Sequence, residues 1–279
     1  MAHQFRLENR AVVGLAGKDC TPFLQNIITC DVENLASSEA RHGALLTPQG
    51  KILFEFILQR REEGYWIDVH ADLADDFIKR LTFYKLRADV SIERTDKSVF
   101  VDLGRTQPNQ DGWFADPRLA DLGMRRYGDD PSLVDGTKAW NTHRIQVGVA
   151  ELVEDYDPSS VFPHEAMFDH FAHGGVDFEK GCYVGQEVVS RMQHRGTARS
   201  RFIHVHAPSG QPLPEKGTDV STADGKTIGT MGSSTGSGGL ALVRLDRAAA
   251  AQTNDFAVRA GDTQVELQLP AYFPGAWPQ

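Results

Sequence analysis

Residues 180–187 (KGCYVGQE) constrain this chain more than any other stretch, because they join a thiol, a cation, two glycines and an amide–carboxylate pair. Gly181 and Gly185 allow a positive φ or a close backbone approach, and few structural needs call for all of these groups together. A cysteine considered alone is more often a buried packing residue. The flanking glycines favour the other interpretation, in which Cys182 is a reactive thiol.

A helix is predicted directly after this loop. Residues 186–195 form a short helical segment that stops at Gly196, and glycine suits the position after a helix C-terminus. Cys182 is then expected in the loop that leads into the helix N-terminus, with Lys180 nearby. The helix dipole and the cation both favour the thiolate over the thiol. Cys182 and Lys180 are therefore the candidate catalytic residues.

The chain has 279 residues, enough for two or three domains, and its 41% hydrophobic and 24% charged residues are ordinary for a globular protein. No apolar run approaches the ~20 residues of a membrane helix, and residues 1–10 lack the features of a secretory signal or transit peptide. Cys20, Cys30 and Cys182 form no CxxC pair and cannot all pair within the chain. These features predict a cytoplasmic protein, in which Cys20 and Cys30 are packing residues near the ends of the first helix.

The net charge of −9 argues against strong nucleic-acid binding, since affinity for phosphate depends on clustered lysine and arginine. One local exception follows the cysteine loop, where a histidine and four arginines lie within eleven residues: Arg191, His194, Arg195, Arg199 and Arg201. Two interpretations stay open for this cluster. It is either a solvated helix face with salt bridges between domains or a cradle for the anionic tail of a ligand.

The first half of the chain predicts mixed strands and helices. A helix is expected from Pro22 to about residue 30, capped by Asp19 or Thr21. After it we expect a β-hairpin over residues 52–59 and 65–69 and an amphipathic helix over residues 73–84. Two strands are expected next, over residues 89–93 and 98–103. Together these elements predict a split βαβ unit. Residues 106–136 are rich in Asp, Pro and Gly and are expected to form loops.

The last eighty residues have a different character. Short apolar runs alternate there with turn residues, over 202–206, 219–221, 227–231, 240–243, 256–258 and 265–269. Several short strands at such spacing predict a small antiparallel barrel or sandwich.

The cysteine loop, together with Arg191-x-x-x-Arg195-Gly196, resembles the signature of the YgfZ-type proteins. These are folate-binding relatives of the glycine cleavage T-protein, an aminomethyltransferase. Residues 192–196 (MQHRG) resemble in addition the branch of iron–sulfur cluster assembly factors. Further segments similar to the family extend over almost the whole chain, at 23–32, 48–53, 144–148, 162–165 and 229–244.

The resemblance implies an α+β fold with three domains in a cloverleaf ring and tetrahydrofolate in the central hole. Residues 1–47 and 137–200 would form a discontinuous folate-binding domain that carries the cysteine loop. Residues 48–136 would form a ferredoxin-like domain, and residues 201–279 a C-terminal antiparallel β-barrel. The elements expected from the residues alone agree with this arrangement.

Two departures from the aminomethyltransferases make aminomethyl transfer doubtful, so the resemblance leaves open whether the chain is an enzyme. Those enzymes carry two consecutive aspartates where this chain has Phe54 and Glu55. Glu55 would still supply a carboxylate, although the alternation of a strand allows it to face solvent. The enzymes also carry a glutamate where this chain has Gln146. An amide hydrogen-bonds a pterin without the added strength of a charge.

The resemblance therefore implies a tetrahydrofolate-binding accessory protein for iron–sulfur cluster assembly or repair that acts through Cys182. One thiolate cannot hold a cluster alone, so the expected partners are iron–sulfur client or assembly proteins, not membranes or nucleic acids. The residues expected to contact tetrahydrofolate, or a one-carbon derivative of it, are Glu55, Arg144, Gln146, Tyr183, Gln186, Arg191 and Arg195.

Three alternatives carry less weight. One is a tetrahydrofolate-dependent aminomethyl or one-carbon transferase, and another is an interaction module that does not bind folate. The third is a metal site, since His164, His170, His173 and Cys182 are zinc-type ligands. Their spacing matches no recognised pattern, so no metal site is predicted.

Overall fold

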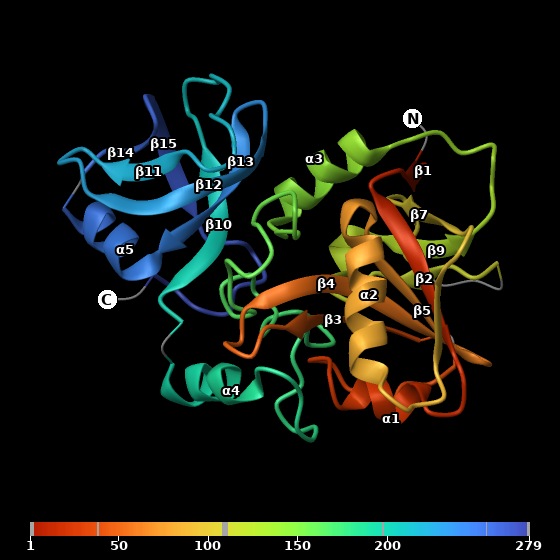
Figure 1. Cartoon of the computed structure of the whole chain (residues 1–279). Helices are drawn as coiled ribbons and strands as arrows, with labels where there is room; N and C mark the ends of the chain where they lie inside the picture. Colours follow the sequence, from red (N-terminus) through yellow and green to blue (C-terminus); the bar gives the residue numbers. More distant parts are fainter. Residues whose placement is uncertain (1–2, 38, 108–110, 197, 255, 278–279) are drawn as a thin grey trace. The chain divides into compact units, whose positions relative to one another are not determined.

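The computed structural model describes residues 3–37, 39–107, 111–196, 198–254 and 256–277. The chain divides into two compact units, the first comprising Met1–Trp140 and Phe171–Val188 and the second Asn141–His170 and Val189–Gln279. The helices α3 (Thr137–Val147) and α4 (Gln186–Arg195) each contain one boundary between the units (Figure 1). The division into three domains suggested by the sequence stays a prediction.

The first unit contains a five-stranded antiparallel sheet in the order β3-β4-β5-β2-β6. Its strands are β2 (Arg10–Ala16), β3 (Ala40–Leu46), β4 (Ile52–Arg61), β5 (Gly64–His70) and β6 (Ser91–Arg94). β4 and β5 confirm the predicted hairpin. Along β4, Phe54 and Phe56 belong to the apolar core, whereas Glu55 is buried on the opposite face.

Two helices, α1 (Cys20–Gln25) and α2 (Ala74–Lys85), contribute apolar side chains to the core on one face of this sheet. The ring of Phe77 packs against Phe54 and Phe56 at centroid distances of 5.3 and 5.8 Å. α2 confirms the predicted amphipathic helix, and it follows a short 3-10 turn, η1 (Ala71–Leu73).

The first helix differs from its prediction at both ends. It ends at Gln25 instead of near residue 30, because Ile28 leaves the helix to form a bridge with Leu45 of β3. Neither Asp19 nor Thr21 caps its N-terminus: both side chains hydrogen-bond residues outside the helix.

A four-stranded sheet in the order β1-β7-β9-β8 completes the first unit. Its strands are β1 (Gln4–Leu7), β7 (Ser98–Asp102), β8 (Phe114–Ala115) and β9 (Met124–Gly128). The expectation of loops over residues 106–136 is wrong, because β8, β9 and the 3-10 helix η2 (Ala120–Leu122) lie within this span. The sequence does not indicate β9, because this strand contains the charged residue Arg125. It is buried, and its charge is paired with Asp68 and Asp116.

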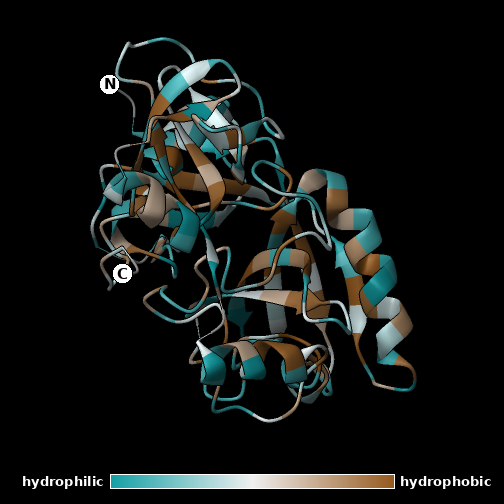
Figure 2. Cartoon of the chain, turned by 90° about the vertical axis from the view of Figure 1, so that its left-hand side faces the viewer, coloured by the Kyte–Doolittle hydropathy of each residue, from teal (hydrophilic) through white to brown (hydrophobic). Residues whose placement is uncertain are grey.

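The second unit contains a closed six-stranded barrel in the order β10-β13-β12-β11-β14-β15. Its strands are β10 (Ser200–His206), β11 (Asp219–Thr222), β12 (Thr227–Thr235), β13 (Gly238–Arg244), β14 (Val258–Ala260) and β15 (Thr263–Gln268). The predicted C-terminal barrel is thereby confirmed. Figure 2 shows that many strands of the chain carry hydrophobic residues.

Helix α5 (Leu245–Thr253) was not predicted from the sequence. Its alanine-rich face is buried, including Ala248, Ala249 and Ala251. No helix within the described ranges is long and apolar enough to cross a membrane.

Candidate functional site

Cys182 lies in the loop of residues 177–185, which leads directly into α4. Asp177 shapes the start of this loop, because its Oδ1 accepts hydrogen bonds from the N–H groups of Glu179 at 2.8 Å and Lys180 at 2.9 Å. The N–H of Asp177 itself donates to the carbonyl oxygen of Thr29 at 2.9 Å. The loop is therefore tied to the segment that follows α1.

Lys180 anchors the loop on one side of Cys182. Its Nζ donates to the carbonyl oxygens of Ile28 and Cys30, each at 2.8 Å. Burial lowers the pKa of this ammonium group. Lys180 thus secures the loop to the chain after α1, and its predicted effect on the Cys182 thiolate stays a prediction.

Tyr183 anchors the loop on the other side. It is 7% exposed, and its ring centroid lies 5.6 Å from Lys180 Nζ, within the range of a cation–π contact. Its hydroxyl group is buried and has no hydrogen-bond partner within the described part of the chain. Buried hydroxyl groups are normally paired, and this one has both its donor and its acceptor capacity unused by the described residues.

Gly185 brings the end of the loop against the turn between β3 and β4. Its φ is +81°, and a Cβ at this position would lie 2.5 Å from the carbonyl oxygen of Thr47 and 3.0 Å from Gly50 Cα. Only glycine fits this approach without strain. α4 then begins at the half-buried Gln186 and ends before Gly196, whose φ is +57°. The predicted helix and its glycine terminator are confirmed.

Cys182 is exposed, whereas Cys20 and Cys30 are buried in the core, and all three are free thiols. Burial raises the pKa of the Cys20 thiol to about 11 and that of Cys30 to about 12. The prediction that Cys20 and Cys30 are packing residues is confirmed. Of the three cysteines, Cys182 is the one that a solute or another protein can reach.

A buried acid–imidazole pair lies on the face of the five-stranded sheet opposite α1 and α2. Glu55 is 6% exposed, and its Oε1 lies 2.9 Å from His42 Nε2. The His42 ring meets Phe171 edge-on at 5.2 Å, and burial lowers the pKa of His42. Glu55 therefore does not face solvent, which strand alternation alone had allowed.

A larger ion cluster on the same face was not anticipated. Asp68 pairs with Arg10 at 2.6 Å and with Arg125 at 2.9 Å, and Asp116 pairs with Arg118 at 2.9 Å and with Arg125 at 2.6 Å. Burial alone would raise the pKa of Asp116, yet the two arginines hold it well below its usual value. No sequence motif marks the cluster, because its members come from separate segments.

Arg144 and Gln146, two predicted folate contacts, lie on α3. Arg144 is fully buried in the second unit, where its guanidinium donates to Asp155 at 2.6 Å, Asn141 at 2.8 Å and Ser233 at 3.0 Å. These bonds use all three of its nitrogen atoms and favour a structural role. Gln146 is exposed.

The arginine cluster after the cysteine loop serves two purposes. Arg191, Arg195 and Arg199 are exposed, as an anion-binding surface requires. Arg201 is buried, and its guanidinium pairs with the Asp169 carboxylate at 2.7 Å. It therefore stabilises the second unit.

Two of the zinc-type ligands noted in the sequence, His164 and His170, have other partners. Within the described ranges, no three His, Cys, Asp or Glu side chains form a group suited to hold a metal ion. His164 Nε2 lies 3.0 Å from Gln193 Oε1, and the His170 ring meets Phe273 edge-on at 5.2 Å.

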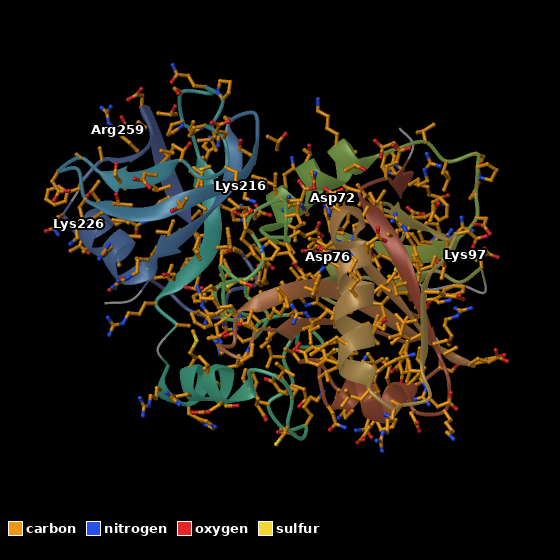
Figure 3. All side chains as sticks on the ribbon, in the orientation of Figure 1. Asp72, Asp76, Lys97, Lys216, Lys226 and Arg259 are labelled. Carbon is orange, nitrogen blue, oxygen red and sulfur yellow. The ribbon has the colours of Figure 1, made fainter. Side chains whose placement is uncertain are left out.

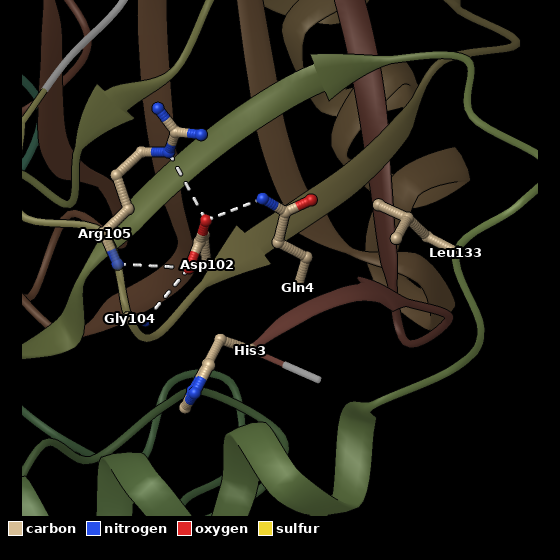
Figure 4. Close-up of a pocket in the computed structure, with 6 residues that line it drawn as sticks. All are labelled: His3, Gln4, Asp102, Gly104, Arg105 and Leu133. Atoms are coloured by element: carbon tan, nitrogen blue, oxygen red, sulfur yellow. Dashed lines mark hydrogen bonds and ion pairs between the residues drawn. The ribbon is translucent and has the colours of Figure 1, made fainter. Parts of the chain in front are cut away.

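A cavity of about 620 Å³ opens elsewhere in the first unit, lined in part by Gln4, Asp102 and Arg105 (Figure 4). The Asp102 carboxylate accepts hydrogen bonds from the Gln4 amide and from the N–H groups of Gly104 and Arg105. Its charge is thereby compensated within the cavity wall. No predicted site residue lines this cavity, so it is not part of the candidate site.

The described residues fit a reduced folate at some of the predicted contacts. The unpaired Tyr183 hydroxyl group suits the polar edge of a pterin, and the exposed Arg191 and Arg195 suit the carboxylates of its tail. The Glu55 carboxylate and the Arg144 guanidinium are instead engaged by partners within their own units.

The fold is of the aminomethyltransferase type. The structure is similar to that of glycine cleavage system aminomethyltransferase T from Bartonella henselae, with a TM-score of 0.75 and 16% sequence identity, over 100% of this chain and 88% of that chain. Residues 199–275 match the family described as CAF17, C-terminal beta-barrel domain. This match spans all six strands of the closed barrel, from the start of β10 to the end of β15.

The relatives in sequence are named as iron–sulfur cluster assembly factors. The chain is 28% identical to "Iron-sulfur cluster assembly factor IBA57, mitochondrial" of Homo sapiens, over 98% of this chain and 85% of that protein. It is 29% identical to the IBA57 homolog of Pyricularia oryzae, over 86% of this chain and 71% of that protein. The predicted kinship with assembly factors is confirmed. Membership of the YgfZ type stays a prediction. The cytoplasmic location also stays a prediction, and the names of these relatives include the word mitochondrial.

Proposed function

We propose that this chain is an accessory factor for iron–sulfur cluster assembly or repair, which binds tetrahydrofolate and acts through Cys182. The observation that carries the proposal is the exposed thiol of Cys182, flanked by two anchored residues, Lys180 and Tyr183. The names of the relatives support the iron–sulfur part. The partners are iron–sulfur client or assembly proteins.

Cys182 supplies one thiolate ligand to an iron–sulfur species that passes between proteins. Because clusters are usually held by four cysteines or close substitutes, the remaining ligands come from the partner protein or from a small thiol. The exposed position of Cys182 lets a second protein approach. The anchors on either side hold the loop in place beforehand, which reduces the ordering cost of the encounter.

Tetrahydrofolate, or a one-carbon derivative, is held by the Tyr183 hydroxyl group and by Arg191 and Arg195. Guanidinium groups bind carboxylates strongly and directionally, so Arg195→Ala should weaken polyglutamylated folate more than the monoglutamylated form. Equal losses for both forms would show that α4 does not hold the tail. If the unaltered protein shows no saturable binding in a calorimetric titration, the chain is an interaction module that does not bind folate.

The decisive experiment compares variants in cells that lack this protein. Cys182→Ser should fail to restore the activities of several iron–sulfur enzymes, whereas an enzyme without a cluster serves as internal reference. Gly181→Ala is the matched control, because Gly181 is the exposed neighbour of Cys182 and a Cβ there meets no described atom within 4 Å. Full restoration by Cys182→Ser would overturn the proposed role of the thiol.

A tetrahydrofolate-dependent aminomethyl or one-carbon transferase is the second candidate, and the fold favours it. The buried Glu55–His42 pair would then be the group that handles a proton. Formation of methylene-tetrahydrofolate from an aminomethyl donor tests this directly. Turnover that survives Cys182→Ser but is lost in Glu55→Gln would support the transferase over the accessory factor.

A further inference from the structure

The C-terminal end of α2 exposes a hydrophobic pair that the proposed function does not use. Phe83 is 70% exposed and Leu86 is 85% exposed. In the described ranges two other large hydrophobic residues are exposed, Val134 at 67% and Phe256 at 48%, and they lie on separate segments. Single exposed hydrophobic residues are ordinary, whereas contiguous exposed hydrophobic patches mark interaction sites.

Leu86 is also held in an unfavourable backbone conformation. It follows the last residue of α2 with φ 46° and ψ −102°. A positive φ costs a residue with a Cβ about 1–2 kcal/mol, and glycine usually occupies this position. The side chain is exposed, so packing within the fold does not offset the strain. Such outliers cluster at sites of function.

The same region is basic, although the chain as a whole has a net charge of −9. Residues 77–88 contain four cations and no acidic residue: Lys79, Arg80, Lys85 and Arg87. Lys79 pairs with Asp76 at 2.9 Å, and Lys85 Nζ donates to the carbonyl oxygen of Val90 at 2.8 Å. Arg80 and Arg87 are exposed and form no ion pair with any described residue. Two cations are therefore available to another molecule.

Arg80, Phe83, Leu86 and Arg87 are all exposed within eight residues at the C-terminal end of α2, and we call this set the α2-end patch. Arg80 and Phe83 are three residues apart along the helix and so lie on one face of it. The opposite end of α2 is acidic, with Asp72 and Asp76 near its start (Figure 3). The patch thus combines an apolar centre with flanking positive charge, as specific protein interfaces do.

We propose that the α2-end patch docks an acidic segment of another protein. The segment presents an apolar side chain to Phe83 and Leu86 and carboxylates to Arg80 and Arg87. Charge complementarity selects this partner. A second copy of the chain fits less well, because a two-fold contact would place each patch against itself and bring like charges together. The proposal does not depend on the role of Cys182.

A fluorescent acidic peptide, with leucines at i, i+4 spacing and glutamates between them, is the probe. It is compared with a peptide in which lysine replaces glutamate and with one in which serine replaces leucine. Fluorescence anisotropy should show that the acidic leucine peptide binds at least roughly tenfold tighter than either control peptide at low salt, and that added salt weakens it. Equal binding of all three peptides would overturn the proposal.

Variants of the full chain locate the binding. Leu86→Gly removes the apolar anchor and relieves the strained φ, so the melting temperature should hold or rise while peptide affinity falls. The double variant Arg80→Glu, Arg87→Glu should lose preference for the acidic peptide, and Val134→Ser, at another exposed hydrophobic residue, should bind like the unaltered protein. Affinity unchanged in Leu86→Gly would refute the assignment. Self-association that Leu86→Gly abolishes, measured by light scattering, would assign the patch to a second copy instead.

Discussion

Replacing Gly185 with alanine tests how the cysteine loop is built. The φ of +81° costs an alanine about 1–2 kcal/mol. The added Cβ would lie 2.5 Å from the carbonyl oxygen of Thr47 and 3.0 Å from Gly50 Cα, and both are backbone atoms that move only if the turn between β3 and β4 moves. Overpacking of this kind costs about 1–3 kcal/mol. The free energy of unfolding of the first unit should therefore fall by about 2–5 kcal/mol.

Alanine variants at two other glycines of the same region distinguish the cost of the positive φ from the cost of overpacking. Gly196 has φ +57°, but a Cβ there meets no described atom within 4 Å, so Gly196→Ala should lose only the conformational cost of about 1–2 kcal/mol. Gly181 has neither feature, and Gly181→Ala should be neutral or stabilising by up to about 1 kcal/mol. Guanidinium denaturation measures the order of stability of the three variants. The rate at which Ellman's reagent modifies Cys182 reports whether the conformation of the cysteine loop has changed. Equal unfolding midpoints for all three variants would refute the packing of Gly185.

Three further predictions concern buried polar groups. Arg144→Met leaves the Asp155 carboxylate buried without its cation, so calorimetry should show a loss of about 3–5 kcal/mol; a loss below about 1 kcal/mol would mean that the pair is solvated. Glu55→Gln keeps a hydrogen bond to His42 and should cost less than Glu55→Leu, a ranking that denaturation midpoints check. Stability should also fall as the pH drops below about 6.5. Burial lowers the pKa of four histidines in the folded state, so below this pH the unfolded chain binds more protons than the folded chain. A melting temperature that is flat from pH 7 to pH 5 would contradict this prediction. The histidines are His42, His164, His170 and His204.

Local signals in the sequence were sufficient for some elements and not for others. α4 was predicted with its bounds, because the glycine after it and its polar start act within a few residues. The strand β9 was missed, because Arg125 is buried only through ion pairs with Asp68 and Asp116. Asp68 belongs to another sheet, and no local pattern reports that pairing.

The same distinction applies to the candidate site. Exposure of Cys182 followed from its glycine-flanked loop, which is a local property. The predicted ligand contact of Arg144 stays a prediction, whereas its partners Asp155 and Ser233, which are distant in sequence, engage it inside the second unit. Glu55 had no predictable orientation until His42 on β3 was placed beside it. Residue identity thus indicated which groups are chemically able to act, and only the fold shows which are still available.

The availability of the Tyr183 hydroxyl group couples ligand binding to the stability of the cysteine loop. A buried hydroxyl group without a partner costs about 1–3 kcal/mol, so a ligand that pairs with it should bind more tightly than one that does not. Tyr183→Phe removes that cost, and the free protein should be unchanged or more stable. Tetrahydrofolate at ten times its Kd should then stabilise the unaltered protein by about 1.4 kcal/mol, and the same concentration should stabilise Tyr183→Phe less. Equal stabilisation of both proteins in thermal melts would show that the hydroxyl group does not contact the ligand, even if folate binds.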